Sequence, residues 1–254
     1  MKQNRIVLVT GGSRGLGKDM ALRIAEKGID VVLTYNQDKD AAEQVVHEIR
    51  AIGRKATALQ FDIANLAGFD RFVDQLQEVL QSEFNTQTID FLVNNGGYGS
   101  SSSAIAETSI EQVDQLMDVY FKGVFFFTQK LLPHLDDGGA IVNISSGLTR
   151  VYAPGRGAYA CMKSAVETLT KYLAKELGSR NIRVNVVAPG AIATDFAGGS
   201  TKNNPQAQTY LKSIAAIPRV GQPDDIGGVV AFLCTDDAKW ITGQRLEVSG
   251  GMAL

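Results

Sequence analysis

Short apolar runs alternate with longer amphipathic segments along the whole chain. The runs are rich in Val, Ile and Leu and are apolar at successive positions, which is typical of strands buried on both faces. They predict strands over 6–10, 30–35, 56–62, 89–94, 139–145, 182–188 and 244–248. The segments between them space their apolar residues three and four apart. They predict helices over 15–27, 38–52, 66–84, 109–135, 156–178 and 223–235.

Strands of this kind, separated by helices, predict a parallel sheet that helices cover on both faces. Right-handed crossovers then give an α/β fold, a Rossmann-type doubly wound sheet of about seven strands. A chain of 254 residues suits one such domain over 1–254. Ligands bind such sheets outside the carboxyl ends of the strands, so we expect the functional residues at these ends.

Composition narrows the class of protein further. Hydrophobic residues make up 44% of the chain and charged residues 20%, and the net charge of −2 gives no electrostatic reason to expect nucleic acid. Cys161 and Cys234 make no disulfide framework, and His47 and His134 do not cluster, so we expect no metal site. The start, residues 1–5, has no signal-peptide apolar region, and no run is long enough to span a bilayer. These features favour a cytoplasmic protein without a membrane partner.

A glycine-rich segment joins the first predicted strand to the first predicted helix. It reads Thr-Gly-Gly-Ser-Arg-Gly-Leu-Gly over 10–17. Glycines allow a tight turn and a close approach of the backbone to a ligand. The helix that follows presents unpaired N–H groups, which bind phosphate well. The segment therefore predicts a dinucleotide site, with the spacing G-x-x-x-G-x-G.

Tyr159 and Lys163 lie four residues apart, on one face of a predicted helix. A free tyrosine has a pKa of about 10. A cation one turn away favours the phenolate, so we expect Lys163 to lower the pKa of Tyr159. Ser146 ends the apolar run 140–146, where its hydroxyl can hydrogen-bond a substrate carbonyl. Such a Tyr-x-x-x-Lys pair is common on exposed helices, so its meaning depends on the other motifs.

Taken together, these motifs resemble the classical short-chain dehydrogenase/reductase family, in a match from Ile6 to the end of the chain. The resemblance extends to the segments Asp62-Ile63, Asn94-Asn95-Gly96-Gly97, Pro189-Gly190 with Thr194, and Ile241-Thr242-Gly243-Gln244. It is strongest to 3-oxoacyl-[acyl-carrier-protein] reductases and related carbonyl reductases. It implies an oxidoreductase that transfers a hydride between a nicotinamide and a ketone or secondary alcohol.

The resemblance assigns the catalytic roles. It implies that Tyr159 is the general acid in reduction and the base in oxidation, that Lys163 also holds the nicotinamide ribose, and that Ser146 orients the carbonyl. Tyr120 stands where the family has an asparagine that binds a water linking the lysine to solvent. Its hydroxyl could hold that water, its larger ring could displace the water, or Tyr120 could be a packing residue only. We expect a weakened or rerouted proton relay in an active enzyme.

The cofactor contacts follow from the same resemblance. They are expected at Gly11, Ser13, Arg14, Leu16, Tyr35, Asn36, Asp62, Ile63, Asn94, Gly96, Tyr159, Lys163, Pro189, Gly190, Ile192 and Thr194. NAD-preferring relatives place an acid at the end of the second strand, where this chain has Tyr35. Because Arg14 can pair with a 2′-phosphate, NADP(H) is favoured over NAD(H). Asp38 would favour NAD(H) if it reached the ribose, and it could equally be a helix N-cap.

The substrate is less well defined by the sequence. The resemblance suggests a substrate flap over 195–218, and the substrate walls predicted are Ser146, Leu148, Val151, Tyr152, Tyr159 and Phe196. With a small, polar loop over 98–103, these suit a moderately apolar ketone, a 3-oxoacyl thioester or a secondary alcohol. The run of three phenylalanines over 125–127 exceeds what one buried helix face needs. The resemblance implies that this helix pairs subunits into a homodimer or homotetramer, with core packing as the alternative.

Two other functions compete with this one. The chain could be an NAD(H)-dependent alcohol or sugar dehydrogenase. It could also be a catalytically silent dinucleotide-binding sensor or scaffold, an interpretation that only Tyr120 favours.

Overall fold

The computed structural model describes residues 4–99 and 103–254, and seven parallel strands form its single sheet, in the order β3-β2-β1-β4-β5-β6-β7. The strands are β1 (Ile6–Val9), β2 (Asp30–Tyr35), β3 (Ala56–Gln60), β4 (Ile89–Asn94), β5 (Leu135–Ile144), β6 (Arg183–Pro189) and β7 (Arg245–Val248). The doubly wound α/β fold is thereby confirmed. The strand order reverses between β1 and β4, and in such folds this is where ligands bind.

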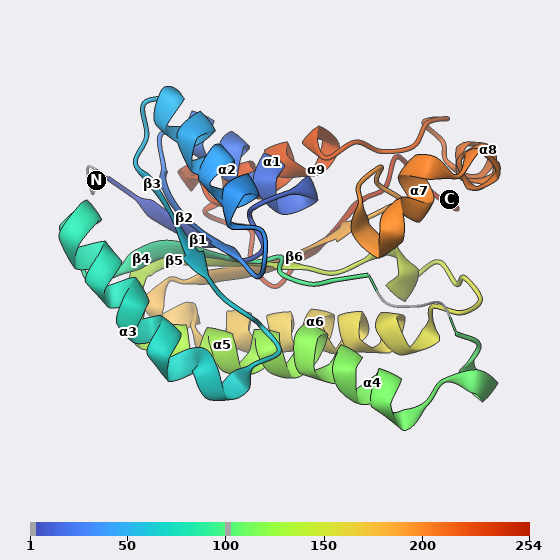
Figure 1. Cartoon of the computed structure of the whole chain (residues 1–254), viewed down its shortest axis with the longest axis horizontal. Helices are drawn as coiled ribbons and strands as arrows, with labels where there is room; N and C mark the ends of the chain where they lie inside the picture. The colour runs from blue at the N-terminus through green and yellow to red at the C-terminus, as the bar shows by residue number, and fades with distance from the viewer. Residues whose placement is uncertain (1–3, 100–102) are drawn as a thin grey trace.

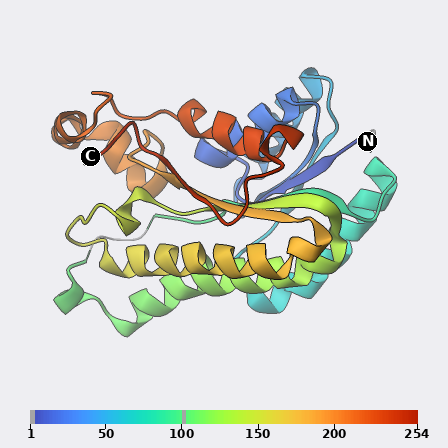
Figure 2. The ribbon, with the colours of Figure 1, turned by 180° about the vertical axis from the view of Figure 1, so that it is seen from behind.

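Helices cover both faces of the sheet. They are α1 (Gly15–Glu26), α2 (Lys39–Ala51), α3 (Phe69–Val79), α4 (Ile110–Met117), α5 (Gly123–Leu131), α6 (Gly157–Glu176), α7 (Ser200–Asn203), α8 (Pro205–Ile214) and α9 (Asp224–Leu233). Figures 1 and 2 show α1, α2 and α9 on one face and α3, α5 and α6 on the other. The α7–α8 segment lies apart from both layers, beyond the carboxyl end of β6 (Figure 1).

The apolar strands divide their side chains between two cores. In β1, Val7 and Val9 pack into the core under α1, α2 and α9, while Ile6 and Leu8 pack into the core of the opposite layer. Successive side chains of a strand point to opposite faces, so an uninterrupted apolar run fills both cores. This burial fixes the sheet and thereby the positions of the loops at the carboxyl ends of its strands.

The predicted helix over 109–135 differs from the structure. A π-helical turn at Asp118–Lys122 separates α4 from α5, and β5 begins at Leu135, earlier than the predicted residue 139. A π turn adds one residue to a helix that otherwise continues, so the spacing of apolar residues does not reveal it. Within the described part of the chain, no helix is both long and apolar enough to cross a membrane.

Candidate active site

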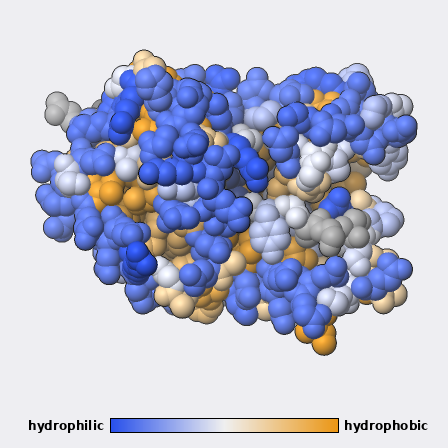
Figure 3. All heavy atoms as spheres, in the orientation of Figure 1, coloured by the Kyte–Doolittle hydropathy of each residue, from blue (hydrophilic) through white to orange (hydrophobic). Residues whose placement is uncertain are grey.

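A cleft of about 1360 Å³ opens at the carboxyl ends of the strands. Figure 3 shows this end of the molecule hollowed between an upper part over α7 and α8 and a lower part over α4. Every predicted site residue except Asn94 lines the cleft: Gly11, Ser13, Arg14, Leu16, Tyr35, Asn36, Asp62, Ile63, Gly96, Tyr120, Ser146, Leu148, Tyr152, Tyr159, Lys163, Pro189, Gly190, Ile192, Thr194 and Phe196. Residues far apart in sequence therefore meet in one cleft.

The glycine-rich loop of the cleft has the form that a phosphate group requires. Gly15 has a φ of +56°, and a Cβ on Gly17 would lie 2.1 Å from the carbonyl oxygen of Gly11. Side chains are thus disfavoured at both positions. The N-cap residue of α1, Arg14, makes no side-chain cap hydrogen bond, and the first residues of the helix, Gly15 to Gly17, line the cleft. This arrangement fits a dinucleotide pyrophosphate.

The end of β2 bears on which dinucleotide fits. Tyr35 is buried at the last position of the strand, and the exposed Arg14 lines the same cleft. Within residues 4–99 and 103–254, the Arg14 guanidinium has no ion pair or hydrogen bond with another side chain. Asp38 accepts a hydrogen bond from the backbone N–H of Ala41 at 2.9 Å and caps α2. The N-cap interpretation of Asp38 is confirmed, although the residue also borders the cleft.

Asn94 lies in the core and not in the cleft. Its Nδ2 donates to Thr128 Oγ1 at 2.9 Å and to Asn143 Oδ1 at 2.8 Å, and the side chain is 4% exposed. The Asn94 side chain therefore supports the sheet beneath the cleft, and the cofactor contact at Asn94 stays a prediction. Its neighbour Asn95, which sequence reasoning missed, lines the cleft and donates through Nδ2 to the carbonyl oxygen of Thr10 at 2.9 Å. Alternation along the strand was the signal that could have separated the two.

Ser146 follows β5 and lies beside a partly buried polar network. Its Oγ accepts from the backbone N–H two residues further on at 3.2 Å. The Oε1 atom of Glu167, on α6, accepts from Ser145 Oγ at 2.6 Å and from Thr149 Oγ1 at 2.8 Å. Arg245, on β7, donates through Nε to the same carboxylate at 2.8 Å. Helix α6 and strand β7 thus hold the turn that presents the Ser146 hydroxyl.

Tyr159 and Lys163 project from α6 into the cleft. Lys163 is 4% exposed, its Nζ donates to the carbonyl oxygen of Ile144 at 2.7 Å, and Nζ lies 5.8 Å from the centre of the Tyr159 ring. Burial lowers the pKa of Lys163 to about 7. Burial also raises the pKa of Tyr159 to about 12, against the opposing effects of a hydrogen bond with Ser146 and the charge of Arg156. The predicted lowering of the tyrosine pKa is wrong for this arrangement. At neutral pH, Tyr159 keeps the proton that a general acid needs.

Tyr120 lies in the π turn, 1% exposed, and contacts both Tyr159 and Lys163. Its ring is perpendicular to that of Tyr159, with 5.0 Å between ring centres. The Nζ atom of Lys163 lies over the Tyr120 ring, 4.6 Å from its centre. The Tyr120 hydroxyl donates to the carbonyl oxygen of Tyr98. A Cβ on Gly97 would lie 2.5 Å from Cε1 of Tyr120, so the ring has room only beside a glycine.

Comparison with known proteins identifies the family. The family model described as Enoyl-(Acyl carrier protein) reductase matches residues 11–253. The chain is 40% identical over 254 residues to the 3-oxoacyl-[acyl-carrier-protein] reductase FabG of Staphylococcus aureus, with 99% of each chain covered. The chain belongs to the short-chain dehydrogenase/reductase family. It is an oxidoreductase of that family, and the resemblance seen in the sequence is confirmed.

Solved structures of reductases from this family have nearly the same fold. The promiscuous reductase LugOII, which catalyses keto-reduction at C1 during lugdunomycin biosynthesis, has a TM-score of 0.93 and 35% identity, with 98% of each chain covered. The angucycline C-6 ketoreductase LanV, solved with bound NADP, has a TM-score of 0.92 and 35% identity, and covers 98% of this chain and 95% of LanV. The fold of this short-chain dehydrogenase/reductase is therefore that of known ketoreductases.

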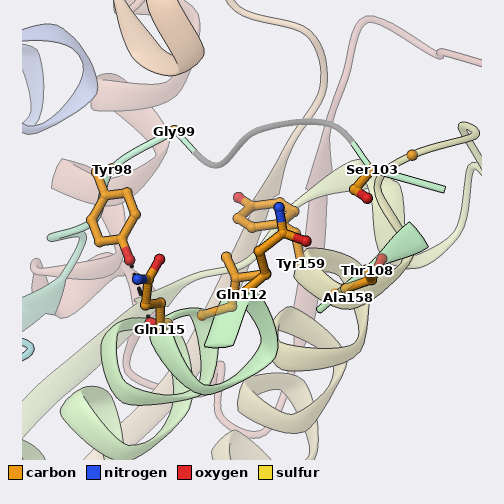
Figure 4. Close-up of a pocket in the computed structure, with 10 residues that line it drawn as sticks. Tyr98, Gly99, Ser103, Thr108, Gln112, Gln115, Ala158 and Tyr159 are labelled. Carbon is orange, nitrogen blue, oxygen red and sulfur yellow. Dashed lines mark hydrogen bonds between the residues drawn. The ribbon is translucent and has the colours of Figure 1, made fainter. Parts of the chain in front are cut away.

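A smaller polar pocket of about 240 Å³ adjoins Tyr159 (Figure 4). Gln112 and Gln115 from α4 line it on one side, opposite Ser103. The Tyr98 hydroxyl donates to the backbone carbonyl of Gln115 at 3.5 Å. Sequence reasoning predicted a small, polar loop over 98–103, of which residues 100–102 lie outside the described part of the chain. The pocket thus offers polar side chains next to Tyr159.

The segment predicted as a substrate flap borders the cleft. It contains a 3-10 turn at Phe196–Gly199, followed by α7 and α8, and Tyr210 of α8 lines the cleft together with Phe196. Lys202 is paired with Asp195 at 2.9 Å. The α7–α8 segment packs mainly through exposed or partly buried residues. Such a segment can open at low cost.

Proposed function

We propose that this chain is an NADP(H)-dependent ketoreductase, which transfers a hydride between the nicotinamide and a ketone or secondary alcohol. One observation carries the proposal: Ser146, Tyr159 and Lys163 meet in the cleft. The pKa of Tyr159, which burial raises to about 12, is in keeping with its role as the proton donor. LanV was solved with NADP, and the Staphylococcus aureus relative is a 3-oxoacyl reductase, which supports the same chemistry here.

The residues present fit the cofactor. The uncapped N-terminus of α1 suits the pyrophosphate, and the unpaired Arg14 suits a 2′-phosphate. Asp38 is engaged as the cap of α2, which weakens the case for NAD(H). We assign Lys163 and Tyr159 to the nicotinamide ribose. A bound NADPH supplies the hydride, and the protein supplies orientation and the proton.

The chain's own groups then act on the substrate oxygen. The Ser146 hydroxyl donates a hydrogen bond that orients the carbonyl and stabilises negative charge as it develops. Tyr159 donates its proton to the same oxygen and takes it back in the reverse reaction. The charge of Lys163 stabilises the tyrosinate left after the transfer.

The cleft favours a moderately apolar ketone or a 3-oxoacyl thioester. Its mouth exposes aromatic side chains, with Tyr152 89%, Tyr210 63% and Phe196 45% exposed. Two basic side chains near this mouth are engaged in ion pairs, since Arg150 Nε lies 3.5 Å from Glu247 Oε2 and Lys202 Nζ lies 2.9 Å from Asp195 Oδ1. An apolar carbonyl compound therefore matches this mouth better than an anionic one. The polar pocket beside Tyr159 suits a hydroxyl or second carbonyl group on the substrate.

The oligomeric state and location are also proposed. Helix α5 exposes Phe126 and α6 exposes Tyr172, at 40% and 65%. Exposed aromatic side chains on two neighbouring helices support a subunit contact and thereby a homodimer or homotetramer. Light scattering on the purified chain measures the mass of the assembly. A cytoplasmic location stays a prediction of the sequence.

The decisive experiment measures oxidation of NADPH and, in parallel, NADH, with cyclic ketones, ethyl acetoacetate and an acetoacetyl thioester. We expect turnover that prefers NADPH. The variant Tyr159→Phe should lose about 10²–10⁴-fold in kcat, because it removes the general acid. It should still bind NADPH, as measured by fluorescence titration. Full activity in Tyr159→Phe, or tight NADPH binding with no turnover on the whole panel, would contradict the proposal.

A further inference from the structure

Tyr120 is a buried polar residue that the proposed chemistry does not use. It fills the space between the catalytic helix α6 and the loop after β4, in contact with Lys163, Tyr159 and the backbone of Tyr98. The short-chain dehydrogenase/reductase resemblance places an asparagine here, as a link in a proton relay. The question is whether the Tyr120 hydroxyl can do the same.

The Tyr120 hydroxyl donates its hydrogen bond to a carbonyl oxygen, which cannot pass a proton on. A relay member must accept a hydrogen bond on one side and donate one on the other, and a tyrosine has a single O–H. That O–H donates to the carbonyl oxygen of Tyr98, which carries no proton. Burial, and then the neighbouring Tyr159, raise the pKa of Tyr120 well above its usual value, so the hydroxyl does not ionise. A proton chain that enters Tyr120 therefore ends there.

The ring of Tyr120 faces the lysine. A buried ammonium needs partners to offset the loss of hydration. Among the described residues, the nearest partners of Lys163 Nζ are the carbonyl oxygen of Ile144 at 2.7 Å and the Tyr120 ring, whose centre is 4.6 Å away, while the centre of the Tyr159 ring lies further off at 5.8 Å. An aromatic face at this distance attracts a cation. The two contacts together hold Nζ on the Tyr159 side of the helix.

We infer that Tyr120 is a positioning residue, which takes the place of the family's asparagine without passing a proton. Its ring holds the Lys163 ammonium in place and packs against Tyr159. Its hydroxyl fixes the Tyr98 backbone at the edge of the substrate pocket. Tyr159 consequently exchanges its proton with solvent through the open cleft, and not through the interior beside Lys163. This inference rests on the proposed reductase function.

Three substitutions of Tyr120 distinguish the effect of its ring from that of its hydroxyl. Tyr120→Phe keeps the ring and loses the hydroxyl, Tyr120→Leu loses both, and Tyr120→Asn restores the family's side chain. For each, we would measure ketone reduction against pH. Activity requires charged Lys163, so it should fall as pH rises through the lysine pKa.

The pH at which activity falls should shift differently in the three variants. In Tyr120→Phe the pH profile should stay within about 0.3 unit of the parent, because the aromatic face remains. In Tyr120→Leu the fall in activity should move to lower pH by roughly 0.5 to 1 unit, because the charged lysine loses its ring. In Tyr120→Asn it should move to higher pH, because a smaller polar side chain lets the ammonium be hydrated.

A second readout tests the backbone anchor. Tyr120→Phe frees the Tyr98 carbonyl, so the KM for the ketone should rise by about 3- to 10-fold while kcat changes less than about threefold. A hydroxyl inside the proton relay would give the opposite split, with a loss in kcat and a changed solvent isotope effect. That result, or a Tyr120→Leu profile equal to the parent's, would overturn the inference. If Tyr120→Leu does not fold, Tyr120→Met replaces it.

The test remains informative if the reductase proposal fails. NMR of protein labelled at lysine Cε reports the pKa of Lys163 without any turnover, with Lys163→Met assigning the signal. The lysine pKa should fall in Tyr120→Leu and hold in Tyr120→Phe. Absence of ketone turnover with these shifts present would reject the proposed function alone, whereas turnover without the shifts would reject the role of Tyr120.

Discussion

Arg14 is the side chain that we propose sets the preference for NADP(H). It lies at the N-terminus of α1, lines the cleft and is exposed. A charge-assisted bidentate hydrogen bond to a phosphate contributes about 1.5–3 kcal/mol. We therefore expect Arg14→Gln to raise the KM for NADPH by about 10- to 100-fold and to leave the KM for NADH within about threefold. Initial-rate kinetics with both cofactors measure this, and an equal loss for NADH would show that Arg14 supports the loop in general.

Lys163 illustrates a residue that lowers stability at the active site. Burial lowers the pKa of Lys163 from 10.5 to about 7. Between pH 7 and pH 10.5, Lys163 is therefore protonated in the unfolded chain and mostly neutral in the folded one. Stability should accordingly rise with pH across this window, and the full penalty is present below it.

The variant Lys163→Met should be more stable than the parent below pH 7, where the buried charge is most costly. We expect a gain of roughly 1–3 kcal/mol after allowance for relaxation around the charge. The gain should disappear above pH 10, and turnover should be lost throughout. Urea unfolding at pH 6.5 and at pH 10 tests this, and equal gains at the two values would show that packing, not charge, is the cause.

Secondary structure was predictable from the sequence where burial on both faces dictates it. Strand β2 matches the predicted bounds at both ends, and β4 does too, because an apolar run between polar turns leaves little choice of register. The π turn at Asp118–Lys122 was missed, since adding one residue to a helix leaves its apolar pattern almost unchanged. The start of β5 at Leu135 depends on pairing with β4, a long-range contact that no local pattern encodes.

The candidate site was predictable as a set of residues and less so in its electrostatics. Motif spacing gave Ser146, Tyr159 and Lys163, because the carboxyl ends of parallel strands must meet. The sequence could not show that burial raises the pKa of Tyr159 against the opposing effects of Ser146 and Arg156, because burial depends on the whole fold. It also could not separate Asn94 from Asn95, since the two side chains point to opposite sides of the same strand end.

The contact between α1 and α9 depends on a glycine. A Cβ on Gly227 would lie 1.9 Å from Asp19 Oδ2 and 3.1 Å from Cγ of Arg23, whereas a Cβ on the adjacent Gly228 would meet nothing within 4 Å. Gly227→Ala should therefore destabilise the protein by about 1–3 kcal/mol. Gly228→Ala is the matched control and should be neutral or stabilising by up to about 1 kcal/mol, because alanine favours helix.

Thermal unfolding of these two variants measures the difference. Their kcat values with NADPH should equal the parent's, since neither glycine lines the cleft. If Gly227→Ala were as stable as Gly228→Ala, the Asp19 carboxylate would have to rotate aside without cost, and the helix contact would be looser than the structure indicates.

In the molecule as a whole, the candidate functional residues lie at one end of the sheet. Loops from β1, β2, β4, β5 and β6 all contribute to the cleft, so the cofactor would touch both halves of the doubly wound fold. A ligand that binds only the folded state stabilises it by mass action, about 2.7 kcal/mol at a concentration 100 times its Kd. The linkage gives a test of the cofactor proposal that needs no substrate.

NADPH at saturating concentration should raise the Tm of the chain by roughly 5–10 °C, because each 1 kcal/mol corresponds to about 2–4 °C in a domain of this size. NADH at the same concentration should raise it less, since it lacks the 2′-phosphate that Arg14 is proposed to bind. The difference between the two cofactors should vanish in Arg14→Gln while a smaller common shift remains, because the pyrophosphate site at α1 is unchanged. Equal shifts in the parent would show that the 2′-phosphate contributes nothing to binding, and no shift with either cofactor would show that the chain does not bind these dinucleotides.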